Sequence, residues 1–314
     1  MKKAGSWLRP LAGRLLGCLI VCWGVATLTF AAIHFTARDP ILIILGETGS
    51  LPTPEMLAYT RHVYGLDQPL IVQYGHYLWG LLHGDLGESW RLRIPVTQAI
   101  SEQMGATVEL AFFAAILSIV LAIGIAVLTA GRAAWVRGLV SGTELVVHSI
   151  PGFVLGILLL LVFSFQLHWL PSTGTEGWKT LVLPAATMAA TLATSLSQVL
   201  RQELERVLEQ PFVLMARARG ASRMGVLFRH ALRHALTPLV TLSGYIFANL
   251  LGGAVIMENL FSRQGIGRLT LNAVNDNDLP VVLGVTLLSA LIYVLINALV
   301  DLLNVVTDPR IREG

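Results

Sequence analysis

The chain has 314 residues, of which 54% are hydrophobic and only 13% carry a charge. Soluble domains carry charges on about 25% of their residues, so this composition argues against a water-soluble globular protein. The formal net charge of +3 is small and gives no reason to expect a nucleic acid as a partner. The only cysteines, Cys18 and Cys22, lie one helical turn apart and match no zinc-ligand spacing, so we expect neither a metal site nor a disulfide there.

Six apolar runs approach or exceed the roughly 20 residues that a helix needs to cross the hydrocarbon core of a bilayer. The first run is longer than the apolar core of a signal peptide, so we expect it to be a retained anchor. The sequence therefore predicts an all-α integral membrane protein with about six transmembrane helices. The runs lie at about 13–34, 106–130, 139–165, 180–200, 236–257 and 281–303.

Basic residues indicate the orientation of these runs, because short loops rich in Lys and Arg stay on the cytoplasmic side. Lys2, Lys3, Arg9 and Arg14 precede the first run, and seven arginines lie in the segment 201–235 between the fourth and the fifth. Two more arginines separate the second run from the third, and two follow the sixth. An even number of spans places all of them on one side, so both termini are predicted to be cytoplasmic.

The segment 35–105 is too long for a simple turn and is predicted to lie outside the membrane. It holds five prolines and several aromatic residues, and its pattern predicts helices over 54–66 and 72–82. We expect a small external cap. The chain then divides into 1–105, the first transmembrane helix with this cap, and 106–314, the transmembrane core.

The inner segment 201–235 is the other long connection. It breaks at Pro211, and the residues that follow predict a short amphipathic helix in which the arginines lie apart from the apolar residues. Its small residues, Ala216, Ala218 and Gly220, leave room for another protein to approach closely. An ordinary basic inner loop would also satisfy the topology.

Short motifs occur in a consistent order along nearly the whole chain, at 64–70, 73–74, 84–87, 215–220 followed by 231–238, 258–268 and 308–310. They resemble motifs in the permease subunits of bacterial ABC importers, and within these the branch for dipeptides, oligopeptides and nickel. The segment 215–220 with 231–238 resembles the cytoplasmic coupling loop of that family, and 258–268 resembles its external signature loop.

The resemblance implies the type I ABC importer permease fold, an inner-membrane location and a protein that is not itself an enzyme. It implies as partners a homologous second permease, two ABC ATPase subunits and an external substrate-binding protein, besides membrane lipid. Two sets of residues match the motifs. The ATPase-coupling loop would comprise Ala216, Arg217, Ala218, Arg219 and Gly220, and the external signature loop Glu258, Phe261, Gly265, Gly267 and Arg268.

One departure from the family pattern concerns the coupling loop. Leu214 and Met215 stand where the parent motif opens with glutamate and alanine, which leaves the docking geometry on the ATPase open. The segment 51–57 most resembles nickel permeases, so the sequence favours nickel or another metal complex as cargo, with dipeptides or oligopeptides as the alternative. The histidines predicted outside form no spaced set of ligands, so no metal site is predicted.

His148 and Pro151 stand out within the third run, because proline removes a helix hydrogen bond and would kink the span. They could line the pathway or serve packing alone. Ionisable residues near the spans, such as Glu109 and Glu144, are functional candidates because charge is costly in a bilayer.

Other classes of protein fit the sequence less well. There is no phosphate-binding loop, so ATP hydrolysis is expected on another chain and no cofactor is expected here. An integral-membrane enzyme would need a nucleophile with its base or a zinc-binding helix, and the sequence shows neither arrangement. An ion-coupled carrier would normally place paired charges or broken helices near the midplane, and the predicted spans are short of such pairs.

Overall fold

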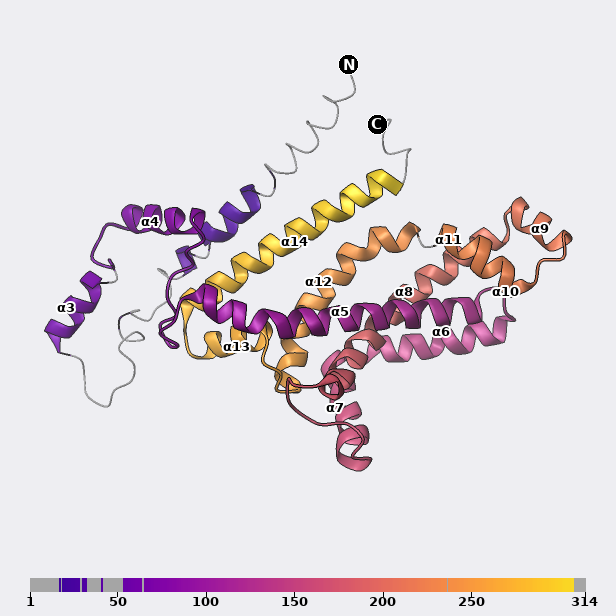
Figure 1. Cartoon of the computed structure of the whole chain (residues 1–314), viewed down its shortest axis with the longest axis horizontal. Helices are drawn as coiled ribbons and strands as arrows, with labels where there is room; N and C mark the ends of the chain where they lie inside the picture. The colour runs from indigo at the N-terminus through magenta and orange to yellow at the C-terminus, as the bar shows by residue number, and fades with distance from the viewer. Residues whose placement is uncertain are drawn as a thin grey trace, which may run out of the picture. The chain divides into compact units, whose positions relative to one another are not determined.

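The computed structural model describes residues 17, 19–28, 30–32, 41, 53–63, 65–235 and 237–307 (Figure 1). Within these ranges the regular structure is helical, and the only strand-like pairing is an isolated bridge between Glu88 and Pro95. The prediction of an all-α fold is confirmed for the described residues. An apolar helix Leu19–Ala32 comes first, inside the predicted first span, whose ends lie outside the described residues.

The remaining elements follow in chain order, and η marks a π-helical segment. They are α3 (Pro54–Val63), α4 (Leu70–Leu82), α5 (Val96–Thr129), α6 (Ala134–Ser149), α7 (Gly152–Leu159), η1 (Leu160–Gln166), α8 (Trp178–Leu208), α9 (Pro211–Ala218), α10 (Arg223–Val226), η2 (Leu227–Ala231), α11 (Leu232–Ala235), α12 (Thr237–Leu260), α13 (Ile266–Asn275) and α14 (Leu279–Thr307).

Three described helices are long and apolar enough to cross a membrane, namely α5, α8 and α14. A fourth candidate is the pair formed by α6 and the segment Gly152–Gln166, which is bent by 98°. The structure therefore does not establish the predicted six spans or the sides on which the termini lie. α12 is a single helix over the predicted fifth span.

The predicted third span, 139–165, differs most from the structure. The kink expected at Pro151 is present, but it is a break between two helices, and α6 begins at Ala134. Ile150 adopts φ −78° and ψ 123°, an extended conformation. A residue before proline is pushed out of the helical region by a clash with the proline ring, so α6 has to end here. Figure 1 shows α7 turning away from the line of α6.

The chain forms two compact units, of which the larger consists of Ala106–Gly267 and Leu295–Gly314. α8 is its central helix, because 67% of its apolar window is buried inside the chain, against 33% for α5. One hydrophobic core packs α5, η1 and α12 around the first half of α8. A second core packs the end of α5, α9 and the segment 226–235 around its last turns.

The other unit consists of Met1–Gly105 and Arg268–Val294. The two helices predicted in its cap are present as α3 and α4. The phenol oxygen of Tyr74 on α4 lies 2.7 Å from Thr27 Oγ1 on the first helix. The buried carboxylate of Asp278 accepts hydrogen bonds from Ser89 Oγ (2.5 Å) and from the amide of Trp90 (3.1 Å), and this ties the loop before α5 to the start of α14.

Candidate functional site

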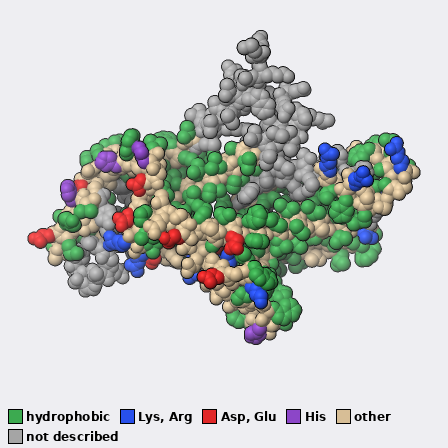
Figure 2. Space-filling view, viewed as in Figure 1, with side chains coloured by type: hydrophobic (Ala, Val, Ile, Leu, Met, Phe, Trp, Pro, Cys, Tyr) green, Lys and Arg blue, Asp and Glu red, His purple; other side chains and the backbone are tan. Residues whose placement is uncertain are grey.

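The predicted amphipathic helix of the inner segment is α9. Its inner face is Val213, which is fully buried, and Ala216, which packs against the second core. On the outside, Leu214 is 59% and Met215 60% exposed, beside the exposed Arg217. α9 is thus a short helix with an apolar and basic outer surface. In Figure 2, Lys and Arg side chains gather around the part that Figure 1 labels α9.

Gly220 ends α9 in a way that depends on glycine. Its amide donates to the carbonyl of Arg217 (2.9 Å), and the amide of Ala221 donates to that of Ala216 (3.1 Å). This pair of bonds is the Schellman motif, which needs a left-handed residue just after the helix. Gly220 supplies it with φ +84°, a conformation that costs glycine little. The predicted coupling residues therefore form one continuous, firmly capped turn.

The predicted signature loop is organised around the Glu258 carboxylate, which is fully buried. Thr107 Oγ1 on α5 donates to Oε1 at 2.5 Å, and the amide of Gly267 donates to Oε2 at 2.7 Å. The same Thr107 oxygen accepts a hydrogen bond from the amide of Ile266 at 2.8 Å. The carboxylate thus holds the loop that follows α12 against α5.

The two glycines of this loop, Gly265 and Gly267, lie so close to α12 that neither position has room for a side chain. A Cβ on Gly265 would lie 2.3 Å from the Glu258 carboxyl carbon, and one on Gly267 would lie 2.4 Å from Val255 Cα. Phe261 is 2% exposed and belongs to the first core. These signature residues are therefore internal supports of the loop. Arg268 is half-buried on α13.

Arg263, in the same loop, was not singled out by sequence reasoning, yet its side chain is fully buried. It donates to Thr180 Oγ1 at 3.2 Å and forms a longer contact of 3.4 Å with Glu109. Burial lowers the pKa of the Arg263 guanidinium from its ordinary value, while the charges of Glu109 and Glu258 act in the opposite direction. The guanidinium joins the loop to the first turn of α8.

His148 and Pro151 meet at a cavity of about 540 Å³ in the larger unit. The cavity lies where α6 breaks, and α8 and α12 form its other walls. Among the described residues it is lined by His148, Pro151, Gly152, Phe153, Thr187, Met188, Thr191, Leu192, Ala248, Asn249, Gly252, Gly253, Ile256 and Met257. Two threonines of α8, Thr187 and Thr191, therefore face the cavity.

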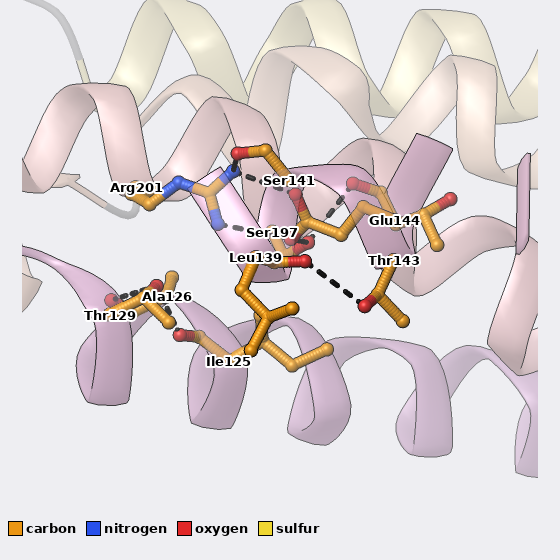
Figure 3. A network of polar contacts seen from close by, with 10 residues as sticks. Ile125, Ala126, Thr129, Leu139, Ser141, Thr143, Glu144, Ser197 and Arg201 are labelled. Carbon is orange, nitrogen blue, oxygen red and sulfur yellow. Dashed lines mark hydrogen bonds and ion pairs between the residues drawn. The ribbon is translucent and has the colours of Figure 1, made fainter. Parts of the chain in front are cut away.

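One helical turn before His148, Glu144 on α6 forms a buried ion pair with Arg201 on α8 (Figure 3). Their side chains are 4% and 8% exposed, and Arg201 reaches the two carboxylate oxygens at 2.7 and 3.1 Å. Ser197 donates to the carboxylate at 2.7 Å, and Arg201 also donates to Ser141 at 3.1 Å. The paired groups satisfy one another in a setting where single charges would be costly.

Comparison with known proteins shows the family to which the chain belongs. Residues 118–313 match the family described as the binding-protein-dependent transport system inner membrane component, and residues 7–111 match the N-terminal part of such membrane components. The chain belongs to this family. It is a membrane permease of an ABC importer, located in the inner membrane with several membrane-spanning helices.

Relatives of known name cover almost the whole permease. A putative peptide transport system permease of Brucella abortus (strain 2308) is 40% identical over 297 residues, which is 92% of this chain and 94% of the relative. The glutathione transport system permease of Salmonella typhimurium (strain LT2) is 35% identical over 301 residues, or 95% and 97% of the two chains. Both are named as transport permeases, in agreement with the prediction that this chain is not an enzyme.

Proposed function

We propose that this permease forms a pathway for short peptides across the inner membrane. In this proposal it pairs with a homologous permease, two ABC ATPase subunits drive it, and an external substrate-binding protein delivers the cargo. The assignment of peptides as the cargo rests on the 40% identity to a relative named as a peptide permease. The relative named for glutathione supports it, because glutathione is itself a short peptide.

The nickel preference drawn from segment 51–57 has no such support. The two relatives reported above are named for peptides and for glutathione, not for nickel. Among the residues that the structure describes, no group of three or more His, Cys, Asp or Glu side chains could hold a metal ion. Residues 51 and 52 of the segment lie outside the described part. A short local resemblance therefore weighs less than similarity along the whole chain.

The cargo can be tested by uptake. Cells that lack this gene are expected to take up a radiolabelled dipeptide at background level, and the gene on a plasmid is expected to restore uptake, while nickel uptake stays unchanged. The measurement compares labelled dipeptide, labelled glutathione and ⁶³Ni²⁺ in the same strains. A fall in nickel uptake alone would overturn the peptide proposal and leave the family assignment intact.

The coupling role proposed for α9 depends on its exposed apolar residues. Met215→Asp places a charge on the outer surface without touching Val213, so the helix is expected to fold. A buried charge in a docking surface can cost about 2 kcal/mol or more, so we expect the affinity for the ATPase subunits to fall by about thirtyfold or more. The measurement is co-purification of the ATPase subunits with the tagged permease.

The matched control is Leu82→Asp, which puts the same charge on a side chain that is 81% exposed in α4. α4 belongs to the segment predicted to lie outside, so this variant should retain the ATPase subunits in full. If Met215→Asp retained them equally well, α9 would not be the docking surface.

A further inference from the structure

The cavity beside the α6–α7 break has a buried floor and an exposed rim. Met188, Leu192 and Met257 of the floor are 5%, 6% and 3% exposed, whereas Phe153 and Ile256 on the rim are 48% and 49% exposed. Its volume of about 540 Å³ lies within the range of about 300–1,000 Å³ that is usual for sites of small ligands. The hollow is therefore large enough to hold part of a cargo molecule.

The floor of the cavity is apolar in effect even where it includes threonines. Thr187 Oγ1 donates to the carbonyl of Leu183 at 2.8 Å, and Thr191 Oγ1 donates to the carbonyl of Thr187 at 3.0 Å. Both hydroxyl protons are thus engaged within α8. The other polar side chains of the lining, His148 and Asn249, are exposed and lie on the rim.

We propose that this cavity receives an apolar side chain of the peptide while the peptide main chain stays at the rim. The inference rests on the proposed peptide transport and adds a subsite to it. A polar rim around an apolar floor fits a peptide, because the exposed imidazole of His148 can pair with a main-chain amide just outside the buried side chain. A lipid acyl chain has no polar group with which such a side chain could pair.

The two methionines of the floor affect the range of side chains that this subsite can accept. Methionine is unbranched and polarisable, and surfaces rich in it adapt to ligands of different shape. Met188 Cε would lie 3.3 Å from a Cβ on Gly253, so the side chain reaches across to α12. We infer that the subsite accepts apolar side chains of several shapes and favours large ones over alanine.

Gly252 gives the sharpest test, because it lines the cavity and a Cβ there would meet no atom within 4 Å. Gly252→Leu is therefore expected to fill the cavity without a clash against the backbone. Gly124→Leu is the matched control, since a Cβ on Gly124 of α5 also meets nothing within 4 Å and this residue does not line the cavity.

The experiment measures uptake of labelled dileucine and dialanine by proteoliposomes that contain the whole transporter and its binding protein. In Gly252→Leu the dileucine-to-dialanine uptake ratio should fall about tenfold. This is the size of effect expected when an apolar pocket loses its contacts with roughly one or two methylene groups of the ligand. Gly124→Leu should leave the ratio unchanged. The same binding protein delivers both peptides to every variant, so the change in this ratio reports on the permease.

A second variant keeps the test valid even if the leucine introduced at position 252 disturbs the fold. Ile256→Ala removes contacts from the rim at a side chain that is half exposed, and it should lower the same ratio by a smaller factor. An unchanged ratio in both variants would overturn the subsite and leave peptide transport standing. If the wild-type transporter carried neither dipeptide, the proposed function would fall and the subsite with it. A wild-type ratio that followed the acyl-chain length of the liposome lipids would instead assign the cavity to lipid.

Discussion

Glu144→Leu alone is expected to destabilise the permease by about 3–5 kcal/mol, the usual cost of removing one partner of a buried ion pair. The reason is that the variant leaves the Arg201 guanidinium 8% exposed and without the carboxylate that it now contacts through two nitrogens. Arg201→Met should cost a similar amount, because it leaves the Glu144 carboxylate with only the Ser197 hydroxyl.

The double variant Glu144→Leu with Arg201→Met is expected to recover most of that loss. Replacing both members of a buried pair by apolar side chains of similar size is often neutral or stabilising, because no charge then remains to be desolvated. Denaturant unfolding of the purified permease in detergent micelles, followed through its helix content, would give the double-mutant cycle. Losses that simply add in the double variant would show that the two side chains do not act as a pair.

The chain contains its own control for this cycle. Arg137 and Glu205 also join α6 to α8, at 3.2 Å, but their side chains are 42% and 30% exposed. A pair that water can reach contributes about 1 kcal/mol or less. Arg137→Met is therefore expected to have a small effect, so a large effect of Glu144→Leu can be attributed to burial and not to any ion pair between these helices.

Hydropathy located the long apolar helices α5, α8 and α14 but placed their ends poorly. α5 begins at Val96 instead of 106, because residues 96–105 include Gln98, Ser101 and Glu102 and do not add to an apolar run. In the same way, α8 continues to Leu208 through a charged last stretch. An apolar run marks the part of a helix that matches the bilayer, whereas hydrogen bonding can continue beyond it.

The contacts within the candidate site could not be predicted from the sequence. The resemblance located the signature loop, yet nothing in the sequence shows that Glu258 meets Thr107 on α5, because the two are 151 residues apart. Glu144 could be flagged as a charge within a span. Its partner, Arg201, carried only the signal of a basic inner loop. Such pairings depend on how α6 packs on α8, and a single sequence does not encode that in any local pattern.

Gly267→Ala in the signature loop would bring a side chain against the helix backbone. The new Cβ would lie 2.4 Å from Val255 Cα and 2.9 Å from Val255 N, which are backbone atoms of α12. Overpacking against side chains costs about 1–3 kcal/mol, and a clash with helix backbone is expected to reach or exceed the upper end of that range. It would also lengthen the bond from the Gly267 amide to Glu258, which now measures 2.7 Å.

Gly265→Ala makes an informative comparison, because its Cβ would meet the Glu258 carboxylate and no backbone atom within the nearest contacts. The carboxylate can move only by giving up its bonds to Thr107 and Gly267, and a hydrogen bond to a charged group contributes about 1.5–3 kcal/mol. We expect both glycine variants to reduce the yield of folded permease and its thermal midpoint in detergent, Gly267→Ala more strongly.

Gly142→Ala is the control for this comparison, since a Cβ there meets nothing within 4 Å and alanine favours the interior of α6. It should leave the midpoint unchanged or raise it slightly. If Gly267→Ala were as stable as Gly142→Ala, the close approach of the loop to α12 would not be a feature of the folded protein. If Gly267→Ala were destabilised and transport by the remaining folded molecules were normal, the glycines would be needed to build the loop and not to move cargo. That result is the one expected of residues as deeply buried as these.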